Sequence, residues 1–141
     1  MDWEKLSATS HLQTALAIRD ELRQQHIEEA SNGLEELIDA LGRSERRALR
    51  SQLTRLMMHI LKWKIQPERR TRSWVASITE ARIEIQSLLE DEPSLRAELP
   101  ALWDRCFAAA KRLAEDETGI EPTMTTLTED EVFAAEYRLT D

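Results

Sequence analysis

The chain has 141 residues, one cysteine and a formal net charge of −8 at pH 7. A single cysteine excludes an internal disulfide and a zinc site built from several cysteines, and the negative charge argues against a general nucleic-acid binder. No apolar run approaches the roughly 18 residues that span a bilayer, and the polar, acidic residues 1–5 do not resemble a signal peptide. We therefore expect a cytoplasmic protein without a membrane segment.

The residue types favour helices throughout the chain. Only 3 Gly and 4 Pro interrupt a sequence rich in Leu, Ala, Glu and Arg, which lose little on entering a helix. We predict an all-α fold, a single-domain bundle of five to six helices over residues 1–141. Residues 1–8 form an N-terminal leader, and Ser10 or a neighbouring hydroxyl residue caps a first helix that runs to about Glu28.

A short second helix is predicted between two local signals. Asn32 followed by Glu35 has the spacing of a capping box, and Gly42 is the residue type that favours the position just after a helix. One apolar stripe lies between them, formed by Leu34, Leu37, Ile38 and Leu41. We expect this helix to end at Gly42 and a new helix to begin at Ser44.

The third and fourth helices are predicted to form a central antiparallel pair. The apolar face of the third consists of Leu49, Leu53, Leu56, Met57, Ile60 and Trp63. Pro67 lacks a backbone donor and disfavours helical geometry at Gln66, so it predicts a break there. The fourth helix spans about 68–90, and its apolar face consists of Trp74, Ile78, Ala81, Ile85, Leu88 and Leu89.

A fifth helix follows a boundary at Pro93. Residues 95–99 form a single turn, and a long helix begins at Pro100 and ends before Gly119, which suits a C′ position. Its predicted apolar stripe consists of Leu102, Cys106, Ala109, Ala110 and Leu113.

The C-terminal segment, residues 120–141, is predicted to be loosely attached to the bundle. Residues 121–127 read as an extended crossing. Thr128 and Glu131 have capping-box spacing and predict a short last helix through Val132.

Several local motifs together resemble one protein family. They are LGRSERR at 41–47, HILKW at 59–63, QPERR at 66–70, SW at 73–74, PSLR at 93–96 and ETG at 117–119. In this order they resemble the bacterial family called domain of unknown function 29, over most of the chain. The resemblance implies an all-helical fold and no established activity, and the stretch after Gly119 matches the family only loosely.

One edge of the third helix carries a candidate cluster. His59, Trp63 and Gln66 recur at helical spacing and therefore stack along that edge. A histidine there can transfer protons or anchor a ligand, whereas the structural alternative is a half-buried histidine beside a core tryptophan. The full cluster, functional or structural, consists of Glu35, Glu36, His59, Lys62, Trp63, Gln66, Arg70 and Trp74.

Metal and cofactor sites are not predicted. Glu35 and Glu36 can meet His59 across a helix interface, and carboxylates with imidazole are plausible metal ligands. More often such groups pair with arginine, and the histidines lack the spacing of the Glu-x-x-His and His-Glu-x-x-His motifs.

The charge is strongly segregated along the chain. Residues 43–72 hold ten basic and two acidic residues. The candidate anion-binding arginines are Arg43, Arg46, Arg47, Arg50, Arg69, Arg70 and Arg72. Because their two groups fall near the starts of successive antiparallel helices, they do not form one patch, and pairing with acidic neighbours is favoured over nucleic-acid or other anion binding.

The cysteine and the tryptophans are interpreted as packing residues. Cys106 lies on a predicted buried stripe, where a thiol behaves as a small apolar group. Trp63, Trp74 and Trp103 stand beside leucines at helical spacing, and Trp3 is expected to be the most exposed of the four.

Three hypotheses for the function remain. The first is a noncatalytic helical adaptor that binds another protein or a second copy of itself, motivated by Ile83 on the polar side of the fourth helix and by the wide apolar arc of the third. The alternative is a nucleic-acid or anion-binding protein that uses the basic span 43–72. A weaker one is a small enzyme centred on His59. None requires a cofactor or a membrane.

Overall fold

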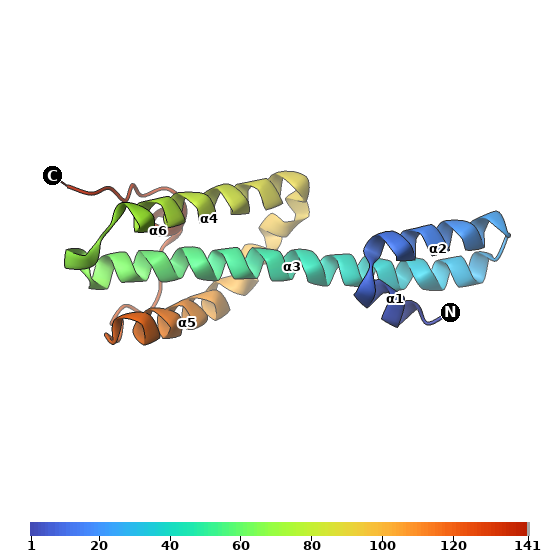
Figure 1. Cartoon of the computed structure of the whole chain (residues 1–141), viewed down its shortest axis with the longest axis horizontal. Helices are drawn as coiled ribbons and strands as arrows, with labels where there is room; N and C mark the ends of the chain where they lie inside the picture. The colour runs from blue at the N-terminus through green and yellow to red at the C-terminus, as the bar shows by residue number, and fades with distance from the viewer. Residues whose placement is uncertain (141) are drawn as a thin grey trace. The chain divides into compact units, whose positions relative to one another are not determined.

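The computed structural model describes residues 1–140, and their regular structure is entirely helical. The helices are α1 (Trp3–Thr9), α2 (His11–Arg23), α3 (Ile27–Ile65), α4 (Arg72–Asp91), α5 (Leu99–Thr118) and α6 (Glu129–Phe133), with 3-10 helices η1 (Pro67–Arg69) and η2 (Pro93–Glu98). The predicted all-α class is confirmed. The chain divides into two compact units, unit 1 (Met1–Arg46) and unit 2 (from Arg47 onward) (Figure 1).

Unit 1 is built from α1, α2 and the first part of α3. The Asp2 side chain caps α1, and Ser10 caps α2 by accepting a hydrogen bond from the backbone N–H of Gln13. The residues predicted to be a leader thus include a helix, and Trp3 on it is buried, which corrects the expectation that it is the most exposed tryptophan. The Trp3 indole Nε1 donates to Glu29 Oε2 at 2.9 Å.

The turn between α2 and α3 lies earlier than predicted. The first long helix ends at Arg23 rather than near Glu28, and the next helix begins at Ile27. Gln25 in the turn has φ +63°, in the left-handed region that usually favours glycine. Because a glutamine occupies this position, the sequence carries no conspicuous turn signal there.

The predicted break at Gly42 is wrong, because α3 continues without interruption from Ile27 to Ile65. Gly33 lies where a Cβ atom would come 2.8 Å from both Ile18 and Trp3, so it permits close packing. A Cβ atom at Gly42 would come 3.2 Å from a guanidinium nitrogen of Arg46. A glycine inside a helix costs only about 1 kcal/mol and does not by itself end the helix.

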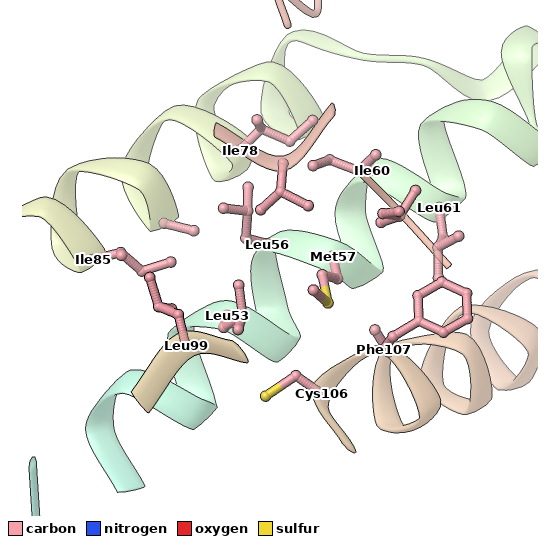
Figure 2. Close-up of a cluster of buried hydrophobic side chains, with 14 of the residues drawn as sticks. Leu53, Leu56, Met57, Ile60, Leu61, Ile78, Ile85, Leu99, Cys106 and Phe107 are labelled. Atoms are coloured by element: carbon pink, nitrogen blue, oxygen red, sulfur yellow. The ribbon is translucent and has the colours of Figure 1, made fainter. Parts of the chain in front are cut away.

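Unit 2 has α3 at the centre of its core. Figures 1 and 2 show α4 and α5 on different sides of α3, with α4 running back along it. Every residue of the predicted face of α3 from Leu49 to Trp63 is buried, and Ile78, Ala81 and Ile85 from α4 complete that contact. The break at Pro67 is confirmed as η1, although α4 begins at Arg72 rather than at 68.

The buried face of α5 is rotated relative to its prediction. Gly119 ends the helix with φ +73° and Cys106 is buried, as predicted. Ala109 and Leu113 are exposed, however, and Phe107 points into the core instead (Figure 2). A phenylalanine removes more apolar area from water than an alanine does, which favours the observed orientation.

The C-terminal segment contributes to the core of unit 2. Leu127 and Val132 are buried, although residues 120–141 were expected to be loosely attached. Trp103 Nε1 donates to the carbonyl oxygen of Leu127 at 2.9 Å, and the capping box of Thr128 and Glu131 is confirmed. These hydrogen bonds fix the course of the segment before α6.

Candidate functional site

Trp63 and Arg70, from the predicted cluster, are joined by two interactions. Arg70 Nε donates to the carbonyl oxygen of Trp63 at 2.8 Å, and the guanidinium carbon lies 4.6 Å from the centroid of the Trp63 ring. The rings of Trp63 and Tyr137 also meet in a T-shaped arrangement, with centroids 5.8 Å apart. Arg70 thus connects the turn after α3 to the end of that helix. Gln66, at the start of η1, forms no side-chain capping hydrogen bond.

Lys62 and Trp74 form the second pair of the cluster. Lys62 Nζ lies 2.7 Å from Glu117 Oε2 and 4.7 Å from the centroid of the Trp74 ring. A lysine between a carboxylate and an aromatic face is held by both charge and ring quadrupole. Lys62 therefore links α3 to α4 and α5, which is a structural arrangement.

His59 is the one member of the cluster with an unusual electrostatic environment. Burial lowers the pKa of its imidazole, the nearby charges of Lys62 and Arg55 lower it further, and Glu117 opposes them. Its Nδ1 atom is buried and has no hydrogen-bond partner within residues 1–140. The imidazole is therefore favoured in its neutral form, without the orienting carboxylate that acid–base catalysis commonly uses.

Glu35 and Glu36 do not form a helix interface with His59, because all three belong to the continuous helix α3. Both glutamates lie in unit 1, whereas His59 lies in unit 2. Among the described side chains, no group of three or more His, Cys, Asp and Glu residues is arranged to hold a metal ion. None of the helices of residues 1–140 combines the length and apolar character that crossing a membrane requires.

The arginines of the basic span are distributed over several elements. Arg43 and Arg46 belong to unit 1, and Arg47 and Arg50 begin the unit 2 part of α3. The remaining three lie at the other end of that part, around η1 and the start of α4: Arg69, Arg70 and Arg72.

One groove joins two arginines of the basic span to a third from another helix. It is lined by Arg50 and Arg55 of α3 and by Arg105 of α5. Only Arg50 belongs to the predicted anion-binding set. Arg105 lies more than fifty residues after Arg50 in the chain, so only the packing of α5 against α3 identifies it as a neighbour.

Unit 1 carries an exposed apolar stripe on α3. Ile27 is 59 % exposed, Leu34 47 %, Ile38 53 % and Leu41 40 %. At 100° per residue these four positions fall within a sector of about 60°. The sequence pattern predicted a stripe of Leu34, Leu37, Ile38 and Leu41, and the structure packs Leu37 against the core of unit 1 but leaves the other three exposed. We call the four exposed residues, Ile27, Leu34, Ile38 and Leu41, the α3 stripe.

The features that first suggested an interaction surface have a mixed outcome. Ile83 on α4 is 55 % exposed, in agreement with its position on the polar side. The wide apolar arc of α3 in unit 2 is largely covered, since Leu61 is buried and Met58 packs against the core. The larger exposed apolar surface therefore lies in unit 1, where it was not expected.

Comparison with known proteins bears on the family alone. No curated protein and no solved structure matches the chain. The model of the family described as domain of unknown function DUF29 matches residues 12–140, which include α3 to α6, all of α2 but its first residue, and every motif that suggested the resemblance. The chain therefore belongs to the DUF29 family.

Proposed function

We propose that this protein is a noncatalytic protein-interaction domain that associates with a second copy of itself through the α3 stripe. The observation that carries the proposal is the exposure of four large aliphatic side chains on one side of one helix. Single exposed apolar residues are ordinary, but a contiguous row is typical of an interaction surface.

The spacing of the stripe suits pairing with another helix. Ile27, Leu34 and Leu41 recur every seven residues, and Ile38 lies four residues after Leu34. This is the spacing of the core positions of a coiled coil, in which each apolar side chain fits between side chains of the facing helix. The other side of the same segment is occupied, because Gly33 packs against Ile18 and Trp3.

The charges beside the stripe favour a second copy in antiparallel orientation. Glu28 and Glu35 flank its N-terminal part, and Arg46 flanks its C-terminal end on the same side. In an antiparallel pair whose stripes overlap, the Glu28 end of each copy lies toward the Arg46 end of the other copy, with the charged sides on the same flank of the interface. A parallel two-fold pair would place this charged side of the two helices on opposite flanks of the interface, so Glu28 and Arg46 of the two copies would not meet. A two-fold interface repeats each favourable contact twice.

The first experiment measures the mass of the full chain in solution by sedimentation equilibrium. We expect a dimer, and we expect Ile38→Ser to weaken it by about 100-fold, because two apolar side chains worth about 1.5 kcal/mol each leave the interface. Ile83→Ser is the matched control, since Ile83 is equally exposed but lies on α4 in unit 2. A monomeric wild-type chain at high concentration contradicts self-association.

The second experiment tests the orientation by exchanging charges. Arg46→Glu and Glu28→Arg should each weaken the dimer by roughly tenfold, because each replaces two weak attractions by two repulsions. The double variant carrying both changes restores the opposite charges and should recover the affinity. If the double variant does not recover the affinity of the dimer, the antiparallel arrangement is contradicted. The Ile38→Ser experiment does not depend on this result, because it tests self-association in either orientation.

If a different protein binds the α3 stripe, we expect another outcome. The chain would then be monomeric at every concentration, and amide exchange of residues 27–41 would not slow as the concentration rises. For a dimer we expect that exchange to slow with concentration, because the interface excludes water from the stripe.

A further inference from the structure

A groove in unit 2 has a lining with positive but no negative charges. Its volume is about 450 Å³, and it lies between α3 and α5. Arg50, Arg55 and Arg105 line it together with Ser51 and Thr54. Among the described residues, the only acidic partner of these arginines is Glu80, 3.6 Å from Arg55 at a well-exposed position where the attraction is weak.

The groove also has an apolar wall. Met58 of α3 and Leu113 of α5 line it, and Leu113 is 44 % exposed. Because α5 is oriented with Phe107 in the core, Leu113 lies on this wall of the groove. A ligand that fits the groove therefore needs an anionic group and an apolar part.

A second cavity of unit 2 provides an internal comparison. Its volume is about 440 Å³ and its lining includes Arg82 and Arg96, but also Glu129 and Asp130. Arg82 already donates from Nε to the carbonyl oxygen of Val132 at 2.8 Å. Arg82 therefore has a carbonyl partner within the protein, and two acidic residues share the lining with the two arginines. The two cavities are alike in size, but the charges lining the second are balanced whereas those lining the first are all positive.

We infer that the groove of Arg50, Arg55 and Arg105 binds a small organic phosphate, a dianion attached to an apolar body. Guanidinium groups match phosphate oxygens by paired hydrogen bonds, and hydroxyls supply further donors. The volume is within the range of small-molecule sites. This inference is independent of the α3 stripe, which lies in the other unit.

The test uses phenyl phosphate as the probe, with the full chain and calorimetric titration at low salt. Phenyl phosphate should bind more tightly than inorganic phosphate, which lacks the apolar part, and than phenol, which lacks the charge. Arg105→Gln should weaken phenyl phosphate binding tenfold or more, since it removes a charge-assisted hydrogen bond. Arg105 is exposed, so the variant leaves the core intact.

Arg96→Gln is the matched control, because Arg96 is also exposed but lines the second cavity. It should leave the affinity for phenyl phosphate unchanged. Equal binding by wild type and Arg105→Gln overturns the inference, as does equal affinity for phenyl phosphate and inorganic phosphate. Binding of a single-stranded oligonucleotide without binding of phenyl phosphate also overturns it, in favour of a nucleic-acid surface.

Discussion

Unit 1 and unit 2 have similar helical sequences, but they differ in how much of their apolar surface is buried. In unit 2, α3 is flanked by α4 and α5, and its apolar face from Leu49 to Trp63 has almost no exposed surface. In unit 1, the same helix shares a small core of Trp3, Ile18 and Ala30, and the α3 stripe remains exposed. A periodic apolar pattern therefore predicts a contact face, but not whether the chain itself covers it.

The two units also differ in the contacts that stabilise them. The core of unit 2 draws on α3, α4, η2, α5 and the C-terminal segment, so many contacts are lost together when one side chain is removed. Unit 1 depends on a few close contacts around one indole ring and one glycine. Substitutions in the two units should therefore differ in size and in how far their effects spread.

The largest effect is expected from a truncation in unit 2. Leu56→Ala should lower the free energy of unfolding by about 3–5 kcal/mol, because Leu56 is fully buried among other large side chains and its removal leaves a cavity. Urea denaturation followed by circular dichroism measures this. A loss below about 1 kcal/mol would mean that the core around Leu56 is not tightly packed.

A smaller effect, restricted to unit 1, is expected from Gly33→Ala. The new Cβ atom would lie 2.8 Å from Ile18 and Trp3, and overpacking of this kind costs roughly 1–3 kcal/mol, against the about 1 kcal/mol that alanine gains in a helix. We expect faster amide exchange in α1 and α2. Unchanged exchange there would show that the ring of Trp3 moves aside without cost.

The fold of unit 2 was more predictable than that of unit 1, for physical reasons. Proline at 67 and glycine at 119 act locally, and the face of α3 from Leu49 to Trp63 is buried by neighbours that follow it in sequence. In unit 1 one signal misled and one turn carried no signal. Gly42 does not end a helix, and Gln25 turns the chain without a glycine.

For the candidate site, the sequence predicted which residues take part better than it predicted which side chains they contact. His59 and Lys62 both belonged to the predicted cluster, but their closeness to Glu117 depends on how α5 packs. The groove of Arg50, Arg55 and Arg105 was missed for the same reason. Contacts between helices distant in sequence depend on side-chain packing, which no local pattern records.

Gly42→Ala sharpens the contrast between the two glycines of α3. Its new Cβ atom would meet only the flexible end of Arg46, at 3.2 Å, and that exposed side chain is free to move. Alanine is favoured over glycine in a helix interior by about 0.8–1 kcal/mol, so we expect a gain of stability of about that size. The same urea experiment applies, and a loss of stability would show that Arg46 is fixed over Gly42.

The smallest effect concerns a titratable group that unit 2 half-buries. Burial, Lys62 and Arg55 lower the pKa of His59 in the folded state below the ordinary value of 6.5. As the pH falls through that ordinary value, the unfolded chain binds a proton at His59 that the folded chain does not, so the free energy of unfolding decreases. Below the folded-state pKa both states are protonated and this loss is complete.

His59→Leu removes that contribution while leaving the other histidines, His11 and His26, in place. Urea denaturation of the wild type and the variant at pH 7.5 and 5.5 therefore isolates His59, since any shared titration cancels in the difference. We expect the wild type to lose more stability than the variant between these two values. Equal losses would mean that the His59 imidazole accepts a proton in the folded core as readily as in water, and that the charges of Lys62 and Arg55 are screened from it.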